Sequence, residues 1–415
     1  MRKAYGVVAA AILIMGTRML APQLLRFRVL IDFLSYYTAA IGYRQGNIYD
    51  VDFLTRFLHP LGLYKTVIAV HSHMYPYVYP PAFAFYFQPL GFLRYGMAYR
   101  LWLLGSWALL LGTTYLIWRM ARAHTALWGL ETKPYAFAVI LILLVYTLPF
   151  DVDLSQGQVN ILLVFLMTLA LMWGLEGRRE GAAGVALAAA ALIKLTPILL
   201  LAYFLVERRW RLIAATLGAT FLIALPTLLF GGWAHWLAYL HFLLRSRSAL
   251  EVKALVGTEA PYNISLLGAW SRVLGRSTAA LILHGLSVLI LFLIAMRAHA
   301  RARARGRGRW TALLAYLTAM VLAAPYGWIV HIVYLLPGAV WVLYAQWERD
   351  TKLAWGLLLA LLFAGLDFPE LYGVFPLLSA LPPAARSLNT GALLFIYLLG
   401  VYTTLREGRG VEGEA

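Results

Sequence analysis

An isolated carboxylate stands near the start of the chain, in the stretch FRVLIDFLSYYTAAIGY, whose sixth residue is Asp32. Asp32 is the one acidic residue between Met1 and Asp50, and its neighbours are Val, Leu, Ile and Phe. A carboxylate beside hydrocarbon is unfavourable unless it is paired or hydrated, so an acid in such a place indicates a functional site. Its chemistry would be proton transfer, as a general base that accepts a hydroxyl proton. The structural alternative is that Asp32 stabilises a helix N-terminus or pairs with Arg26 or Arg28.

A second group of polar residues is the segment DVDLSQGQVN, residues 151–160, which holds two acids and three amides between two apolar segments. Amides both donate and accept hydrogen bonds, as recognition of the many hydroxyls of a sugar requires. Gln158 and Asn160 are therefore predicted to bind substrate. Turn and helix-cap formation is the alternative explanation, because these residue types also favour turns.

Basic residues at unexpected places form the third group. Lys194 follows an apolar run in AALIKLTPILL, and further cations lie at His235, His241, Arg245, Arg247 and Lys253. Ammonium and guanidinium groups bind phosphoryl oxygens through charge-assisted hydrogen bonds, so these residues predict a phosphate site. Contact with lipid headgroups is the alternative for the arginines. The segment PYGWIVH adds Trp328 and His331 on one helical turn, where an interfacial aromatic belt is the alternative.

The acid, the amides and the cations together suggest transfer of a sugar from a lipid-linked phosphate. The sequence contains no HExxH zinc motif, no GxSxG elbow and no P-loop. It therefore lacks the usual patterns of zinc proteases, lipases and nucleoside triphosphatases.

The elements that hold these residues belong to a very apolar chain. Of its 415 residues, 62% are hydrophobic and 13% are charged, and the mean hydropathy is +0.75. Soluble domains are about half apolar, so the composition predicts an all-α polytopic membrane protein with one integral membrane domain, 1–415. The net charge of +17 fits basic cytoplasmic loops against anionic lipid, and no nucleic-acid partner is expected because no basic soluble domain is present. The absence of cysteine excludes disulfides and thiolate metal sites.

About ten spanning helices are predicted, and a re-entrant or short-helix pair brings the total to about twelve. The first, Tyr5–Ala21, lacks a small-residue cleavage site and is expected to be retained. The others are Met97–Trp118, Tyr135–Phe150, Val159–Leu175, Leu212–Phe230, Thr278–Met296, Thr311–Ala324, Ile329–Tyr344, Leu353–Leu366 and Thr390–Thr404. Basic loops belong in the cytoplasm, so the arginine-rich loop 297–309 and both chain termini are placed there.

With the basic loops in the cytoplasm, the alternation of the spans places the unusual polar residues at the external ends of the helices. The first external loop, 22–96, is too long for a simple connection and is expected to carry short helices of its own. One is Leu30–Arg44, on which Asp32 and Tyr36 share a face, and it is expected to lie in the membrane interface without crossing.

Residues 182–206 lie between two basic loops that both belong in the cytoplasm, yet these 25 residues, at about 1.5 Å each, are too few to cross a membrane twice. Pro197 lacks an amide hydrogen and disfavours a helix at Thr196, which splits the segment and leaves Lys194 near its tip. The sequence therefore predicts a re-entrant hairpin whose irregular backbone lines a wet cavity. A single span with one loop on the wrong side is the alternative.

Motifs of one family occur in order along the chain. They are Asp32-Phe33, Tyr36-Tyr37, Ala39-Ala40, Gly46, Tyr49-Asp50, Tyr79-Pro80-Pro81, Pro89, Gly157-Gln158-Val159-Asn160, Ala183-Gly184, Lys194-Leu195-Thr196-Pro197, Trp328 and His331. In this combination they resemble glycosyltransferase family 87, polytopic enzymes of the C-type superfamily that include polyprenyl-phosphate-mannose-dependent mannosyltransferases. The family pattern often has Ser before the tryptophan and a second His, where this chain has Gly327 and Val330.

The resemblance implies the C-type glycosyltransferase fold and inverting transfer of a hexose, foremost mannose, from a polyprenyl-phosphate donor to a lipid or glycan acceptor. The reaction would take place at the extracytoplasmic face of a bacterial-type cell membrane, with membrane lipids as further partners and with no nucleotide sugar, metal or other cofactor. The resemblance makes Asp32 the catalytic base and assigns the donor phosphate to Lys194 and His331, with Arg245 as a helper. Expected substrate contacts are Tyr36, Tyr37, Tyr79, Gln158, Asn160 and Trp328.

A transporter or flippase of lipid-linked sugars is the alternative function, since a broken helix with a polar midpoint is also typical of transporters. A transporter needs polar residues exposed toward both sides, whereas those of this chain gather at the external ends, which favours an enzyme. A structural assembly subunit is the third possibility, and it would have no use for Asp32.

Overall fold

The computed structural model describes residues 6, 10, 29–71, 75–124, 150–245, 258–260, 262–306, 308–366 and 387–409, and every regular element among them is helical. Of the predicted spans Tyr5–Ala21 and Tyr135–Phe150, all but three residues lie outside this part of the chain. Arg247 and Lys253 lie outside it as well.

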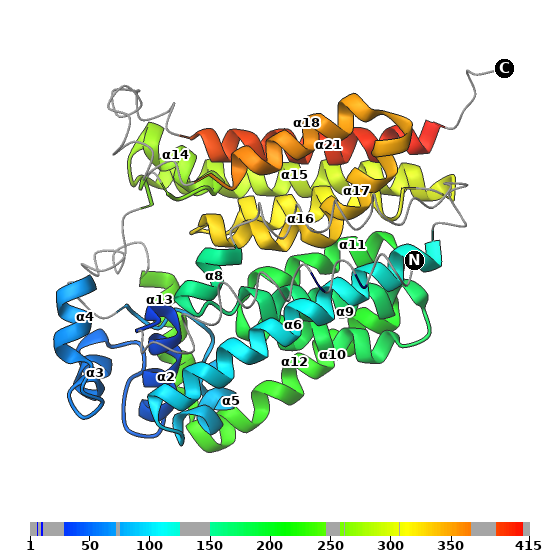
Figure 1. Cartoon of the computed structure of the whole chain (residues 1–415). Helices are drawn as coiled ribbons and strands as arrows, with labels where there is room; N and C mark the ends of the chain where they lie inside the picture. The colour runs from blue at the N-terminus through cyan, green and yellow to red at the C-terminus, as the bar shows by residue number, and fades with distance from the viewer. Residues whose placement is uncertain are drawn as a thin grey trace.

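The first half of the fold begins with short helices and continues with longer apolar ones (Figure 1). Its elements are α2 (Ile31–Gly42), α3 (Val51–Thr55), η1 (Arg56–Leu58), α4 (Tyr64–His71), α5 (Pro81–Gly91), α6 (Tyr95–His124), α8 (Phe150–Gln156), α9 (Asn160–Glu176), α10 (Glu180–Ile193), η3 (Thr196–Leu200), α11 (Leu201–Val206), α12 (Trp210–Gly231) and α13 (Trp233–Arg245).

The second half consists of α14 (Leu266–Leu274), α15 (Thr278–Ala304), α16 (Thr311–Ala323), η5 (Ile329–Leu335), α17 (Leu336–Arg349), α18 (Thr351–Ala364) and α21 (Leu388–Arg409). Figure 1 shows α15, α16, α18 and α21 side by side in one half of the molecule and α6, α9, α10 and α12 in the other. The two halves meet where α16 contacts η3, α9 contacts η5 and α11 contacts α15.

Five of the described helical segments are long and apolar enough to cross a membrane. They are Tyr95–Met120, Trp210–Gly231, Thr278–Ala304, Ile329–Trp347 and Leu388–Glu407. The segment Ile329–Trp347 is buried throughout, whereas α15 exposes most of its apolar side chains, which identifies α15 as a peripheral helix with a surface suited to lipid. The architecture is that of an all-α polytopic membrane protein.

The chain reverses direction at Lys194. The α-helix α10 ends at Ile193, Lys194 has extended backbone angles, and Pro197 begins the return through η3 and α11. The two arms end side by side, because the Arg209 guanidinium lies 2.9 Å from the Glu180 carboxylate. The chain therefore turns back on itself within 182–206, and the re-entrant position of this hairpin in a membrane stays a prediction.

Helix α2 is covered on all sides, which corrects the expectation of an amphipathic interfacial helix over Leu30–Arg44. Every one of its side chains is buried except those of Asp32 and Ile41, which are partly exposed. The close fit depends on Gly157, whose φ of +70° favours glycine and at which a Cβ would lie 2.7 Å from Phe33 Cβ. Helix α2 is therefore a core element, held rigidly against the chain that precedes α9.

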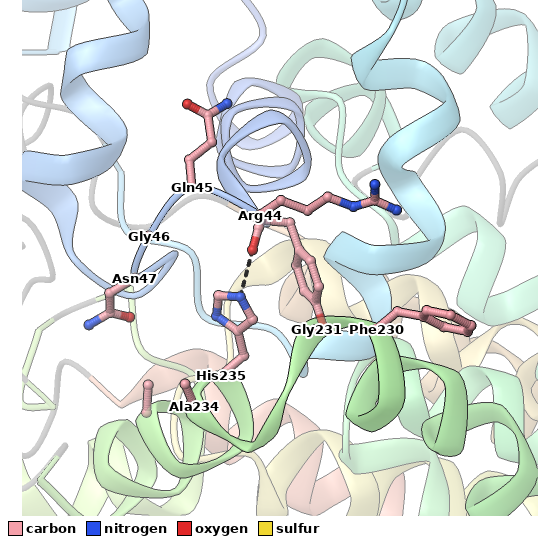
Figure 2. Close-up of a pocket in the computed structure, with 10 residues that line it drawn as sticks. Arg44, Gln45, Gly46, Asn47, Phe230, Gly231, Ala234 and His235 are labelled. Carbon is pink, nitrogen blue, oxygen red and sulfur yellow. Dashed lines mark hydrogen bonds between the residues drawn. The ribbon is translucent and has the colours of Figure 1, made fainter.

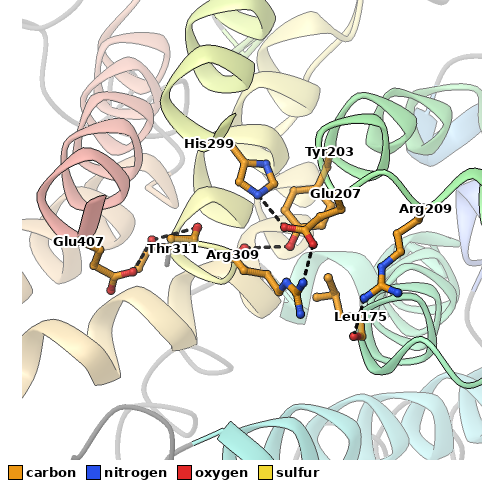
Figure 3. Close-up of polar contacts among 9 residues, drawn as sticks. Leu175, Tyr203, Glu207, Arg209, His299, Arg309, Thr311 and Glu407 are labelled. Atoms are coloured by element: carbon orange, nitrogen blue, oxygen red, sulfur yellow. Dashed lines mark hydrogen bonds and ion pairs between the residues drawn. The ribbon is translucent and has the colours of Figure 1, made fainter. Parts of the chain in front are cut away.

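The predicted basic loop 297–309 is wrong over most of its length, because α15 continues through Ala304. Alanine and arginine are both strong helix formers, and the segment alternates them. Contacts on its inner side hold it further, since His299 is fully buried and lies 3.0 Å from Glu207, which also pairs with Arg309 at 2.8 Å (Figure 3).

Candidate active site

A cavity of about 250 Å³ lies between α2, the segment before α5, the turn at Lys194 and the start of η5. It collects residues that are far apart in the sequence, and two aromatic residues of α13, Tyr239 and Phe242, extend its wall. The predicted site residues that line it are Asp32, Tyr79, Gln158, Lys194, Trp328 and His331.

Asp32 is a buried carboxylate with properties suited to a general base. It lies in the first turn of α2, but its side chain makes no capping hydrogen bond there. Its buried Oδ2 atom accepts no hydrogen bond from any described residue. Burial raises the pKa of Asp32 to about 7, although the nearby charge of Lys194 and the amide of Gln158 lower it. A carboxylate with a pKa near neutrality is well matched to general-base work.

Asn160 connects an acid to the lysine. Its Nδ2 donates to Asp153 Oδ1 at 2.7 Å, while its Oδ1 accepts from Lys194 Nζ at 3.4 Å and from the Tyr334 hydroxyl. These hydrogen bonds hold Lys194 toward the cavity, where its Nζ lies 5.8 Å from the ring centroid of Tyr79 and 5.9 Å from that of Tyr334.

His331 and Lys194 present two donors to one point. The Trp328 backbone N–H donates to His331 Nδ1 at 2.8 Å, so a neutral ring carries its proton on Nε2. This Nε2 atom lies 2.5 Å from Lys194 Nζ, which also bears protons when charged. Two donors so close together repel each other, and an anion that accepts a hydrogen bond from each would stabilise the pair. Phosphate oxygens accept from both kinds of N–H.

Three predicted site residues remain, and the two whose side chains the structure describes do not line the cavity. Tyr36 lies behind the cavity wall, where its hydroxyl is 2.9 Å from that of Tyr79 and 3.4 Å from Gln158 Oε1. Tyr37 is directed away, because its hydroxyl donates to the Leu93 carbonyl at 2.7 Å, and the structure does not place it with the other site residues. Arg245 ends α13, and its side chain lies outside what the structure describes.

Two residues of the site were not singled out from the sequence. Asp153 is fully buried, and burial raises its pKa to about 7 against the lowering effects of Asn160 and Lys194. Tyr334 follows His331 by three residues, so helical spacing could have indicated it. Nothing in the sequence separates Asp153 from Asp151, since both stand in the same polar segment.

A second cavity, of about 800 Å³, lies at the opposite end of α2 (Figure 2). Arg44, Gln45 and Asn47 line it, and His235 closes one side with a 2.6 Å hydrogen bond between its Nε2 and the Tyr43 carbonyl oxygen. It is larger than the first cavity, but no described carboxylate lines it, and of the cations predicted to bind phosphate only His235 is in its lining. The smaller cavity, which brings the acid and the cations together, is therefore the candidate active site.

Within the described residues, no three His, Asp or Glu side chains are grouped so that they could hold a metal ion. The expectation that the reaction needs no metal stays a prediction.

A buried carboxylate, an amide-bearing wall and a lysine–histidine pair of N–H donors inside an all-helical apolar protein are the parts that a membrane-embedded group-transfer enzyme requires. The chain belongs to glycosyltransferase family 87, whose sequence profile matches residues 77–325. It is a membrane glycosyltransferase. The profile match includes Tyr79, Gln158 and Lys194, whereas Asp32 and His331 lie outside it.

Two relatives carry the same descriptive name, polyprenol-phosphate-mannose-dependent alpha-(1-2)-phosphatidylinositol pentamannoside mannosyltransferase. The protein of Mycolicibacterium smegmatis is 31% identical over 307 residues, which cover 72% of this chain and 70% of that protein. The protein of Mycobacterium tuberculosis is 28% identical over 296 residues, which cover 69% of this chain and 63% of that protein, less than two thirds of its length. No solved structure matches the chain.

Proposed function

We propose that the enzyme transfers a hexose, mannose, from a polyprenyl-phosphate donor to a hydroxyl of a lipid or glycan acceptor. The observation that carries the proposal is that Asp32 and the Lys194–His331 pair line one cavity, so a base and a phosphate site are within reach of one sugar. The printed names of the two relatives, which are polyprenol-phosphate-mannose-dependent, support mannose and its lipid phosphate as the donor.

The reaction would be a single displacement. Asp32 accepts the proton of the acceptor hydroxyl, whose oxygen attacks C1 of the sugar on the side opposite the phosphate. The bond between C1 and the phosphate oxygen breaks, and its electron pair leaves with polyprenyl phosphate, whose charge Lys194 and His331 stabilise. One displacement inverts the configuration at C1. Gln158, Tyr79 and Trp328 would contact the sugar, while Asn160 and Tyr36 position the groups in front of them.

We further propose a C-type glycosyltransferase fold with about ten spans, cytoplasmic termini and an extracytoplasmic active site in the cell membrane. Single cysteines at Leu195, beside the turn, and at Arg303, near the end of α15, test the sidedness in this cysteine-free chain. An impermeant thiol reagent should label Leu195→Cys from outside intact cells and Arg303→Cys only after the membrane is opened. Labelling of both cysteines only after opening would reject the proposed orientation.

The function itself is tested by reconstituting the purified enzyme in liposomes with radiolabelled polyprenyl-phosphate mannose and a lipid extract as acceptor. We expect a labelled glycolipid or glycan, and none when a nucleotide-linked mannose replaces the lipid donor. Label that crosses the bilayer without entering a product would instead support the transporter alternative. Product formed directly from the nucleotide sugar would contradict the proposed donor.

A further inference from the structure

The returning arm of the hairpin, η3 and α11, packs along α15 and leaves two cavities on the seam between them. The apolar cavity, of about 380 Å³, is walled on the α15 side by Gly285, Val288, Leu289 and Phe292. The arginine cavity, of about 420 Å³, follows it toward the end of α15. Neither contains a residue of the proposed active site, which lies beyond the start of η3.

The two cavities follow one stripe of α15. Met296, Ala300 and Arg303 wall the arginine cavity and continue the three- and four-residue spacing that Val288 and Phe292 begin. The stripe from Val288 to Arg303 is about 22 Å long at 1.5 Å per residue. One leaflet of a bilayer with its headgroups is about as deep, roughly 20 to 22 Å.

An unusual backbone conformation places Arg208 at the arginine cavity. It has a φ of 56° and is the one non-glycine residue with a positive φ in the described part of the chain. Its neighbours are engaged elsewhere, since Glu207 contacts His299 and Arg309 (Figure 3). Arg209 in turn contacts Glu180. The strained turn thus separates the Arg208 side chain from an otherwise paired cluster.

Arg208 and Arg303 give this cavity a net positive charge. Both line it, and no described carboxylate lies within ion-pair distance of either guanidinium. The rest of the wall is Leu205, Val206, Met296 and two alanines. A positive end on an apolar seam is complementary to a phosphate that carries hydrocarbon chains.

We propose that this seam binds an anionic phospholipid, with its phosphate between Arg208 and Arg303 and an acyl chain along the apolar cavity. Other observations favour a lipid over a protein partner. Leu289 and Leu293 of α15 are 55% exposed, as side chains that face a bilayer would be. In the orientation proposed above, the basic residues here lie on the cytoplasmic side, where anionic lipids are concentrated. The bound lipid would hold the returning arm against α15 and so stabilise the hairpin.

The test uses the full-length enzyme, purified in detergent and stripped of lipid, titrated with phosphatidylglycerol or phosphatidylcholine and followed by native mass spectrometry and by Tm. Wild type should retain phosphatidylglycerol preferentially and gain Tm from it. The double variant Arg208→Gln/Arg303→Gln should bind it about thirtyfold more weakly, because two basic contacts are lost. The control Arg297→Gln/Arg301→Gln, which removes two exposed arginines of α15 outside both cavities, should change binding less than about threefold.

The proposed site for the acyl chain is tested separately with Val288→Trp, which fills the apolar cavity. The control is Ile290→Trp, on the exposed side of the same helix. Only the first should lower phosphatidylglycerol retention, and an excess of soluble glycerol phosphate should not displace the lipid. Equal retention of the two phospholipids by wild type would overturn the proposal. Equal losses in the two arginine pairs, or displacement by glycerol phosphate, would overturn it as well. The Tm measured without lipid shows that each variant is folded.

Discussion

Asp32→Asn should lower the rate of sugar transfer at least about a thousandfold. Asparagine has nearly the same shape as aspartate, but its side chain cannot accept the hydroxyl proton at the moment of attack. The Lys194–His331 pair remains in place, so binding of the lipid donor should change little. Initial rates with saturating donor and acceptor, together with donor binding measured directly, separate the two effects.

Asp52→Asn is the matched control, because Asp52 is an exposed acid 20 residues after Asp32 and lies outside the cavity. It should keep the full rate. A rate for Asp32→Asn within about tenfold of wild type would remove Asp32 from the mechanism, since loss of a general base costs a hundredfold or more.

The pH dependence follows from the same group. Burial raises the pKa of Asp32 to about 7, so its carboxylate form is lost as the pH falls below that value. We expect kcat/KM to fall about tenfold per pH unit on the acid side of pH 6. It should fall again above about pH 8, because burial lowers the pKa of Lys194 to about 8 and the ammonium form is lost there. Asp153 also has its pKa raised to about 7, so Asp153→Asn should be measured beside wild type. If Asp32 is the base, the acid limb persists in that variant.

Lys194→Gln is expected to have the second-largest effect, a decrease of about a hundredfold or more in kcat/KM for the lipid donor. The ammonium group would contact the phosphate both in the bound donor and in the leaving group, so KM should rise and kcat should fall together. His331→Gln should act in the same direction. Because the two side chains lie 2.5 Å apart, the double variant should lose much less than the product of the single losses.

Lys65→Gln provides the control for this series, since Lys65 is exposed on α4 and does not line the cavity. Its kinetic constants should match those of wild type. Independent, multiplicative losses from Lys194→Gln and His331→Gln would show that the two residues do not share one phosphate.

The sequence predicted the helical class and most helix positions because long apolar runs leave little choice of structure. It was less informative about α2, where periodicity cannot show which side faces a cavity when every side is buried. For this reason Tyr36 and Tyr37 could not be distinguished, although only Tyr36 hydrogen-bonds to a residue of the cavity wall. The extension of α15 through Ala304 was missed because arginine content was taken to indicate a loop.

The pairing of Lys194 with His331 joins residues 137 positions apart, and only the packing of η5 beside the turn at Lys194 creates it. Residue type alone indicated that each could bind phosphate. In the segment DVDLSQGQVN, Asp151 is exposed and Asp153 is buried, although both belong to α8. Local sequence gives no sign of that difference, because it depends on how α8 lies against its neighbours.

The hairpin at Lys194 also limits the order in which a cell can complete the protein. Residues 180–206 leave the ribosome before α15 and α16, yet α11 packs against α15 and η3 packs against α16. Irregular backbone at membrane depth is stable only when other protein or water surrounds it. In the proposed re-entrant topology the two short arms are therefore completed only by helices translated later. A ribosome stalled before α16 would have produced Asp32 and Lys194 without the helices that pack around the hairpin.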